Sequence, residues 1–263
     1  MQGNGMRDMD YHFNVNLAAN YSKPTQRIRA LTEPWVKENI YCPHCGNPSI
    51  EKFPNNKPVA DFYCPQCKSE YELKSKKGAI GRKIADGAYD SFIQRITSIN
   101  NPNFFILNYD ARELCVNNLW MIPKHFFVPD IVEKRNPLSQ VAQRAGWVGC
   151  NILFYRIPVQ GQISIIHNRV LMDKNSVIAQ VRRSARLYTK NIDERGWLLD
   201  VLNCVNKIEK PTFELGEIYG FENWLFQKHP QNHNVRPKIR QQLQVLRDKG
   251  FIEFTGRGTY SKI

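Results

Sequence analysis

Two Cys-x-x-Cys pairs place the strongest constraint on how this chain can fold. Cys42 and Cys45 form the first pair and Cys64 and Cys67 the second, with eighteen residues between the pairs. Each pair presents two thiolates from one tight turn, and a structural zinc site needs four thiolates at the corners of a tetrahedron. The spacing therefore predicts one closed Zn²⁺ site that leaves no coordination position open for catalysis.

The alternative uses of these cysteines are disulfide bonding and redox chemistry. The first six residues lack the apolar core of a signal peptide, and no run of about 18 apolar residues predicts a membrane span. We therefore expect a cytoplasmic chain without a membrane partner, in a compartment where disulfides are rare. Two separate redox motifs are hard to reconcile with the doubled spacing. Cys115, Cys150 and Cys204 stand alone in apolar stretches and are expected in the core.

A group of charged residues surrounds the second cysteine pair. Residues 59–63 and 70–75 each have the pattern of a short strand, so the cysteine turn between them is predicted to cap a hairpin. Side chains alternate along a strand, which puts Glu72 and Lys74 on one face and Leu73 on the other, toward a core. Asp61 on the neighbouring strand can face the same pair. The pattern predicts two carboxylates and one lysine in a single patch.

Phosphodiester hydrolysis needs such a patch. Carboxylates hold Mg²⁺, which polarises the phosphate and lowers the pKa of bound water, and a lysine stabilises the developing negative charge. We predict Asp61, Glu72 and Lys74 as catalytic residues, with Asp61, Glu72 and the Leu73 carbonyl as Mg²⁺ ligands. The alternative is a surface hairpin with cross-strand ion pairs, because an Asp followed by Glu-x-Lys is a weak pattern by itself.

The neighbouring segments predict an α/β (α+β) fold. Residues 25–39 are expected to be helical, and apolar residues at Ile84, Ala88, Phe92 and Ile96 predict a helix over residues 82–99. Residues 104–109 and 114–122 read as strands. The order of helix, hairpin, strand, helix, strand and strand implies a mixed sheet with packed helices. It is the order of a PD-(D/E)xK nuclease core, whose motif begins here at Pro58, with the four-cysteine zinc site as an insertion.

The C-terminal part predicts a winged helix. Helices are expected at residues 193–208, 215–219, 221–227 and 234–249, followed by a β-hairpin. The last of these helices would be a recognition helix, because Arg and Gln side chains reach guanine and adenine edges in the major groove. The predicted DNA-binding residues of this part are Arg236, Lys238, Arg240, Gln241, Gln244 and, at the wing tip, Arg257. The alternative is a winged helix that contacts protein.

Charge and one tryptophan add to the prediction of a nucleic-acid partner. The chain has 37 Lys and Arg against 24 Asp and Glu, a formal net charge of +13, and the excess is shared by the first 180 residues and the last 83. Such a balance favours a polyanion, although a solvated basic surface is the simpler alternative. Trp147, flanked by glycine and preceded by Arg144, is predicted to stack on DNA or on an extruded base; the alternative is a core position, which is the more common one for such a tryptophan.

Several stretches together resemble the DpnI-type methyl-directed type II restriction endonucleases, a group that overlaps the Dam-replacing family. The resemblance runs from about residue 10 to the end of the chain. The matching stretches are Pro58-Val59-Ala60-Asp61-Phe62-Tyr63-Cys64, Glu72-Leu73-Lys74-Ser75-Lys76-Lys77-Gly78, Asn101-Pro102-Asn103-Phe104-Phe105, Arg144-Ala145-Gly146-Trp147, Ile239-Arg240-Gln241-Gln242-Leu243-Gln244, Leu246-Arg247-Asp248-Lys249-Gly250 and Gly256-Arg257-Gly258.

The resemblance implies a prokaryotic enzyme that cuts double-stranded DNA at GATC when the adenine carries an N6-methyl group. It implies a PD-(D/E)xK endonuclease domain with a zinc-binding hairpin at residues 1–185 and a winged-helix DNA-binding domain at residues 190–263. No obligate protein partner is expected. Two alternatives stay open at this point: a non-catalytic zinc and winged-helix regulator that binds DNA, and a PD-(D/E)xK nuclease of other specificity. No residue of the sequence identifies a pocket for the methyl group.

Overall fold

The protein is described here from a computed structural model, which covers residues 9–54 and 60–263. The chain divides into two compact units. Of the described residues, unit 1 comprises 9–54, 60–81, 100–124 and 162–182, and unit 2 comprises 82–99, 125–161 and 183–263. The predicted domain boundary between residues 185 and 190 stays a prediction. Pro58 and Val59, which begin the predicted nuclease motif, lie outside the described residues.

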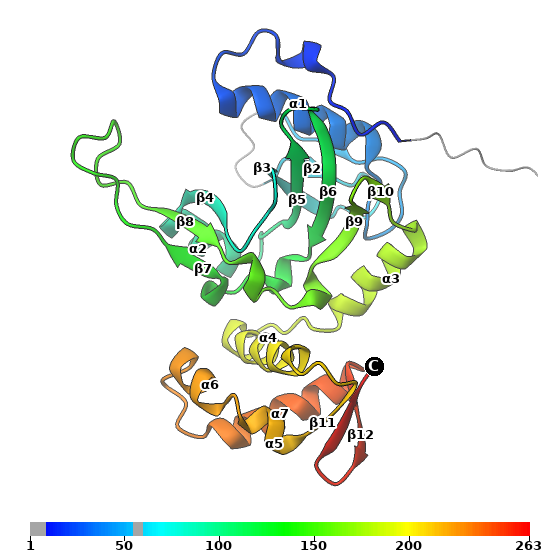
Figure 1. Ribbon diagram of the computed structural model, residues 1–263, viewed down its shortest axis with the longest axis vertical. Helices are drawn as coiled ribbons and strands as arrows, with labels where there is room; N and C mark the ends of the chain where they lie inside the picture. The colour runs from blue at the N-terminus through cyan, green and yellow to red at the C-terminus, as the bar shows by residue number, and fades with distance from the viewer. Residues whose placement is uncertain (1–8, 55–59) are drawn as a thin grey trace, which may run out of the picture. The chain divides into compact units, whose positions relative to one another are not determined.

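A seven-stranded mixed sheet forms the centre of unit 1 (Figure 1). Its strands lie in the order β1-β2-β3-β5-β6-β9-β10, in which β3 and β5 run parallel and every other neighbouring pair is antiparallel. The strands are β1 (Glu51–Lys52), β2 (Phe62–Tyr63), β3 (Glu70–Lys77), β5 (Asn103–Asp110), β6 (Cys115–Ile122), β9 (Ile163–His167) and β10 (Val170–Leu171). The parallel pairing of β3 with β5 sets Glu72 beside Phe104 and Leu73 beside Phe105.

Helix α1 (Pro24–Asn39) and the first turns of α3 (Lys174–Ala185) pack on one face of this sheet. Proline at the first position of α1 suits a helix start, because its missing N–H would have no partner there. Trp35 and Val36 of α1 belong to the same buried cluster as Tyr71 of β3 and Phe105 of β5. Leu73 packs against this cluster, as predicted, so the opposite face of β3 carries Glu72 and Lys74.

Part of unit 2 is a three-stranded antiparallel sheet in the order β4-β8-β7. Its elements are β4 (Ile84–Ala88), α2 (Tyr89–Thr97), β7 (Val132–Lys134) and β8 (Gly149–Ile152). The prediction of one helix over residues 82–99 was wrong in its first half, because residues 84–88 pair with β8 instead. That partner lies some sixty residues later in the chain, and local periodicity carries no signal for a pairing over such a distance.

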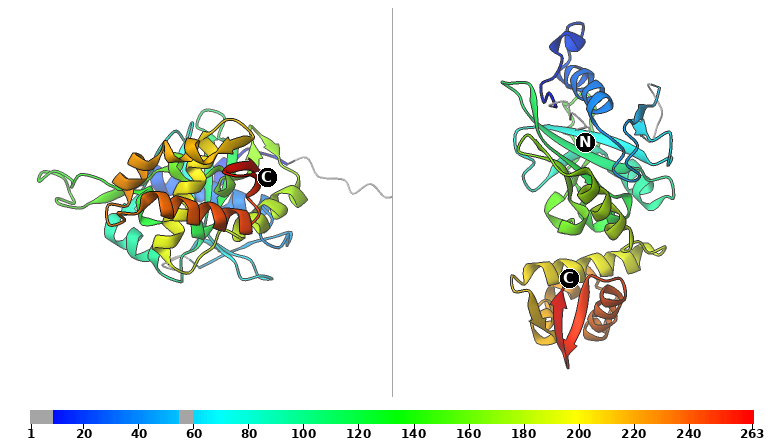
Figure 2. Two further views of the ribbon diagram at one scale, coloured as in Figure 1. Left: turned by 90° about the horizontal axis from the view of Figure 1, so that it is seen from below. Right: turned by 90° about the vertical axis from the view of Figure 1, so that its right-hand side faces the viewer.

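The C-terminal part of unit 2 has the predicted winged-helix elements, with one strand and one helix more than the three helices and hairpin of a minimal module. Sheet order is β11-β13-β12, and α4 packs on α7 (Figures 1 and 2). The elements are α4 (Ile192–Lys207), β11 (Thr212–Glu214), α5 (Leu215–Tyr219), α6 (Glu222–Lys228), α7 (Val235–Asp248), β12 (Ile252–Gly256) and β13 (Thr259–Lys262). The buried stripe of α7 is the predicted one: Val235, Ile239, Leu243 and Leu246.

Short 3₁₀ helices connect several of these elements. They are η1 (Val15–Ala18), η2 (Lys124–Phe126), η3 (Pro129–Ile131), η4 (Phe154–Arg156) and η5 (Val159–Gly161). Within residues 9–54 and 60–263, no helix is both long and apolar enough to span a membrane.

Candidate active site and metal centre

The two cysteine turns have the same backbone geometry. In the first turn the Cys42 N–H donates to the Asn47 carbonyl, and the Gly46 N–H donates to the Cys42 carbonyl. In the second turn the Cys64 N–H donates to the Ser69 carbonyl, and the Lys68 N–H donates to the Cys64 carbonyl. These bonds measure 2.9 and 2.8 Å at Cys42 and 2.9 and 3.0 Å at Cys64. The residue four positions on has a positive φ in both turns: Gly46 in the first and Lys68 in the second. The paired turns bring all four thiol groups to one point, as the spacing predicted.

The four sulfur atoms fit a zinc ion. All Sγ atoms of Cys42, Cys45, Cys64 and Cys67 lie within 4.8 Å of one another. Two of the edges, Cys42 to Cys67 and Cys45 to Cys64, measure 3.5 and 3.6 Å. A tetrahedron with Zn–S bonds of about 2.3 Å has edges of about 3.8 Å. Within the described part of the chain this is the one group of three or more Cys, His, Asp or Glu ligand atoms so closely placed.

Tyr71 connects the cysteine cluster to strand β3. Its hydroxyl lies 3.1 Å from Cys42 Sγ and 3.0 Å from His44 Nδ1, and its ring stacks on Phe105 at 4.5 Å between centroids. Burial, followed by the charge of Lys124, lowers the pKa of His44 to about 4. His44 is therefore a neutral hydrogen-bonding partner at pH 7 and not a cation. Sequence reasoning did not identify Tyr71 as a partner of the first cysteine turn.

The hydrogen bonds around Cys67 favour its thiolate. Burial acts to raise the pKa of this thiol, but hydrogen bonds with the Ser69 hydroxyl and N–H and with the Cys42 and Cys45 sulfurs outweigh it and lower the pKa to about 7. The thiolate is the form that binds metal. Cys115, Cys150 and Cys204 are buried in the core, as predicted.

Asp61 lies next to β3, immediately before β2. Its N–H donates to the Tyr71 carbonyl at 3.0 Å, and its Oδ2 accepts the Leu73 N–H at 2.8 Å. The β2–β3 pairing sets Phe62 opposite Tyr71, which brings Asp61 to the segment that carries Glu72. Burial raises the pKa of the Asp61 carboxyl, and the Leu73 N–H opposes that shift.

Glu72 and Lys74 lie on one face of β3 and form an ion pair. Lys74 Nζ is 2.6 Å from Glu72 Oε1, and the two side chains are 18% and 12% exposed, Lys74 being the more exposed. The positive charge of Lys74 also reaches Asp61, where it acts to lower the pKa of the carboxyl. The structure thus brings together the three side chains that the sequence placed in one patch.

Two further charged residues next to Asp61 were missed by the sequence reasoning. Arg29 Nη2 of α1 lies 3.2 Å from Asp61 Oδ1, and Arg29 Nε is hydrogen-bonded to Glu33. Glu33 also pairs with Lys52 of β1, at 2.6 Å. The available signal was the i, i+4 spacing of Arg29 and Glu33 in a predicted helix, which puts both on one face.

The polar residues predicted to bind DNA on α7 lie largely on its exposed side. Arg236 donates to Glu222 at 2.8 Å, and Arg240 donates to the Tyr219 hydroxyl at 2.8 Å. Gln241 and Gln244 are exposed, whereas Lys238 is half-buried. Arg257 is exposed in the turn between β12 and β13. All six side chains belong to unit 2.

Trp147 and Arg144 lie in the loop of residues 135–148, which joins β7 to β8 and projects from that sheet in Figures 1 and 2. Arg144 is exposed and Trp147 is half-buried. The indole ring lies against the backbone of Gly149, where an added Cβ would come within 2.8 Å of it. The half-buried indole, close to Gly149 through Cζ3 and Cη2, leaves Trp147 between the predicted DNA contact and the alternative core position.

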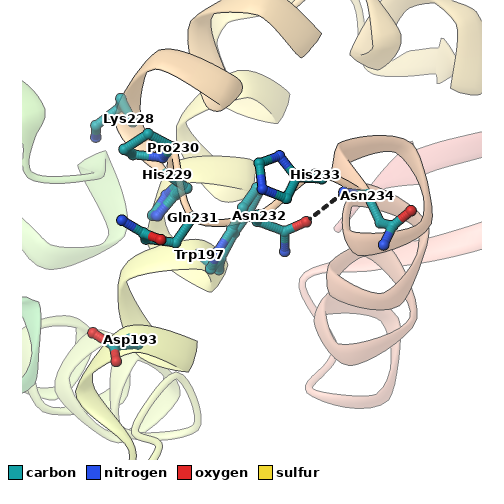
Figure 3. A pocket seen from close by; sticks show the side chains of 9 residues that line it. All are labelled: Asp193, Trp197, Lys228, His229, Pro230, Gln231, Asn232, His233 and Asn234. Carbon is teal, nitrogen blue, oxygen red and sulfur yellow. Dashed lines mark hydrogen bonds between the residues drawn. The ribbon is translucent and has the colours of Figure 1, made fainter.

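A pocket of about 600 Å³ lies at the start of the predicted recognition helix (Figure 3). Sequence reasoning gave no sign of it. Trp197 and His229 stack at 3.9 Å between ring centroids, and His229 Nε2 is 2.8 Å from Asp200 Oδ2. The lining residues are Asp193, Trp197, Lys228, His229, Pro230, Gln231, Asn232, His233 and Asn234. Most of the polar lining comes from the turn that leads into α7.

Comparison with known families gives two matches. The sequence model of the Dam-replacing family matches residues 9–190. The model of the Dam-replacing HTH domain matches residues 193–262. The first match contains the cysteine cluster and the Asp61 patch, and the second runs from the second residue of α4 to the end of β13.

Proposed function

The chain belongs to the Dam-replacing family of restriction endonucleases, and from that premise we propose that it cleaves double-stranded DNA by Mg²⁺-dependent hydrolysis at GATC sites with N6-methylated adenine. The family makes the chain a site-specific nuclease with DNA as its partner. The metal, the sequence and the methyl group are our proposal. The single observation that supports the chemistry best is the grouping of Asp61, Glu72 and Lys74 around one end of the β2–β3 hairpin.

The donor atoms in this group suit Mg²⁺ rather than Zn²⁺. We propose that Asp61 and Glu72 are the metal ligands, with the Leu73 carbonyl as a third. Mg²⁺ prefers oxygen ligands and is usually held by one or two carboxylates together with phosphate and water. The four thiolates, by contrast, are soft ligands that select zinc. When bound, Mg²⁺ would polarise the scissile phosphate and lower the pKa of a coordinated water.

The protein's own groups then have separate roles in the proposed reaction. The Leu73 N–H fixes one carboxylate oxygen of Asp61, so that the carboxylate is oriented before substrate arrives. Lys74, held beside Glu72 by the 2.6 Å ion pair, provides an ammonium group that can stabilise the negative charge developing on the phosphate. The zinc site would hold the hairpin in shape, since each of its two strands adjoins a cysteine turn.

DNA recognition is proposed for unit 2. The exposed side chains of Arg236, Arg240, Gln241 and Gln244 on α7 can contact base edges or phosphates, and Arg257 in the wing turn can contact phosphate. Lys238, which is half-buried, is included in the same proposed surface. Arg144 and Trp147 form a further proposed contact. We further propose the division into an endonuclease domain at residues 1–185 and a DNA-binding domain at residues 190–263, which the spans of the two family matches support.

A plasmid digest tests this proposal. Adenine-methylated and unmethylated preparations of one plasmid are incubated with the protein, with Mg²⁺ or with a chelator of Mg²⁺. We expect cutting of the methylated plasmid only, and only with Mg²⁺. Absence of cutting in all four reactions would favour a DNA-binding regulator, and equal cutting of both plasmids would favour a nuclease of other specificity.

A further inference from the structure

One arginine on α1 holds two carboxylates of unit 1 at the same time. The guanidinium of Arg29 donates through Nε to Glu33 and through Nη2 to Asp61 Oδ1, the latter at 3.2 Å. Arg29 and Glu33 are four residues apart on α1, so both side chains leave the same face of the helix. Arg29 therefore links helix α1 to the carboxylate that the proposed reaction needs.

Glu33 is built into the fold as the anchor of this arginine. Its side chain is only 6% exposed, and it is paired with Arg29 and with Lys52 of β1, whose Nζ lies 2.6 Å from its second oxygen. A carboxylate so deeply buried is costly to leave without a positive partner. The Arg29 side chain, by contrast, is 60% exposed and would have many rotamers in water. Its pairing with Glu33 restricts it to the conformation that reaches Asp61.

Arg29 provides the second of two hydrogen bonds that orient the Asp61 carboxylate. The backbone around Asp61 is fixed by sheet hydrogen bonds to Phe53 and Tyr71. The Leu73 N–H binds Oδ2, and Arg29 binds Oδ1. Two contacts, one on each oxygen, define the plane of the carboxylate group, whereas one contact leaves it free to turn. Each carboxylate oxygen has a second lone pair, so both contacts leave room for a metal ligand bond.

We propose that Arg29 is a positioning residue of the active site, held by Glu33 and Lys52, and that it acts by orienting the Asp61 carboxylate for metal binding. The inference rests on the proposed function, since it assigns a partner to the catalytic Asp61. It adds residues that belong to α1 and β1 to a site otherwise made from the β2–β3 hairpin.

The test combines cleavage with a binding measurement. Arg29→Ala, Arg29→Lys and Glu33→Gln are compared with the natural protein and with Arg27→Ala, an exposed arginine on the same helix that donates a 3.4 Å hydrogen bond to the Tyr21 carbonyl. We expect Arg29→Ala to lower kcat by about 10- to 100-fold, because a small misplacement of a catalytic group has effects of this size. KM for DNA should change less than about threefold, since the effect is on chemistry and not on uniform binding.

A second readout does not depend on turnover. Ca²⁺ binds the same kind of oxygen ligands as Mg²⁺. DNA binding is therefore followed by fluorescence anisotropy of a methylated duplex as Ca²⁺ is added, with electrophoresis to verify that the duplex is uncut. Arg29→Ala should need severalfold more Ca²⁺ for half-maximal binding, and Glu33→Gln should shift it in the same direction. Arg29→Lys should need nearly as much Ca²⁺ as Arg29→Ala, because an ammonium group cannot bridge two carboxylates as a guanidinium does.

The controls separate this inference from the proposed function. In an Asp61→Asn background, Arg29→Ala should cause no further change in the Ca²⁺ requirement. A persisting effect would mean that Arg29 does not act through Asp61. A raised KM with normal kcat and a normal Ca²⁺ requirement would make Arg29 a phosphate contact only, and behaviour like Arg27→Ala in both assays would overturn its role altogether. Cleavage by Asp61→Ala would instead refute the proposed function. If Arg29→Ala lowers the melting temperature, its loss of activity does not separate positioning from folding. The inference is then tested with Glu33→Gln, by its kcat for cleavage and its Ca²⁺ requirement for DNA binding.

Discussion

The β2–β3 hairpin of unit 1 and the α7 surface of unit 2 hold their polar side chains in opposite ways. Asp61, Glu72 and Lys74 are each less than 20% exposed and are each held by a hydrogen bond or an ion pair. Arg236 and Arg240 on α7 are exposed, and their partners Glu222 and Tyr219 lie on neighbouring short helices of the same unit.

The difference corresponds to two physical tasks. Chemistry at phosphorus requires groups fixed to within a fraction of an ångström, which buried and paired side chains provide. Contact with a DNA groove requires long charged side chains that can release water and counterions as they bind. If this distinction is correct, changes in the hairpin should affect rate or metal binding, and changes on α7 should affect DNA affinity and its dependence on salt.

The largest effect is expected for Asp61→Ala. Removal of the carboxylate should lower the cleavage rate by at least about 100-fold, comparable to the loss of a single preorganised electrostatic group, while DNA binding stays measurable. Cleavage is measured on methylated plasmid and binding by gel shift. Loss of DNA binding together with cleavage would break the comparison, because it would give Asp61 a structural role.

Zinc removal should destabilise the hairpin as a whole. Cys42→Ser should purify with less zinc and with a lower melting temperature, because metal binding energy contributes to folding. Zinc content is measured by mass spectrometry and melting by circular dichroism. Cys204→Ala, which changes a buried cysteine outside the cluster, is the control and should keep its zinc. Equal melting of the natural protein with and without a chelator would contradict a structural zinc site.

Tyr71→Phe gives a finer test of the same region. The substitution removes the hydroxyl next to Cys42 and His44 but keeps the ring that stacks on Phe105. Partners of metal ligands typically contribute about 10- to 100-fold to metal affinity, so we expect a loss of zinc affinity in that range. Competition with a chromogenic chelator measures it. Unchanged zinc affinity would show that the hydroxyl serves only the packing of β3.

The smallest effects are expected on the DNA-binding surface. Arg240→Ala should weaken DNA binding by about 10-fold. The slope of the logarithm of the binding constant against the logarithm of the salt concentration should decrease in magnitude by about one, as expected for the loss of one phosphate contact, and kcat at saturating DNA should be unchanged. Arg257→Ala, at the exposed wing turn, should have a smaller effect of the same kind. Anisotropy titrations at several salt concentrations measure both. A loss of kcat in Arg240→Ala without a loss of affinity would remove the distinction between the two regions.

Much of the hairpin was predictable because its signals are local. Period-two alternation put Glu72 and Lys74 on one face, and β3 was predicted within two residues of its observed end. The segment of residues 82–99 shows the limit. Its four apolar residues fit a helical stripe, yet Ile84 belongs to a strand that pairs with Ile152. A helix satisfies its hydrogen bonds within itself, whereas a strand depends on a partner that local pattern does not identify.

The sequence by itself determined which four cysteines form the cluster, the shared face of Glu72 and Lys74, and the buried stripe of α7. Each follows from spacing within a single turn, strand or helix, where covalent geometry limits the distances. Only the tertiary structure decided that Arg29 and Glu33 accompany Asp61, that Tyr71 contacts Cys42, and that a pocket opens at the start of α7. These contacts join segments that are distant in the chain, and they depend on how strands and helices pack, which is a property of the whole fold.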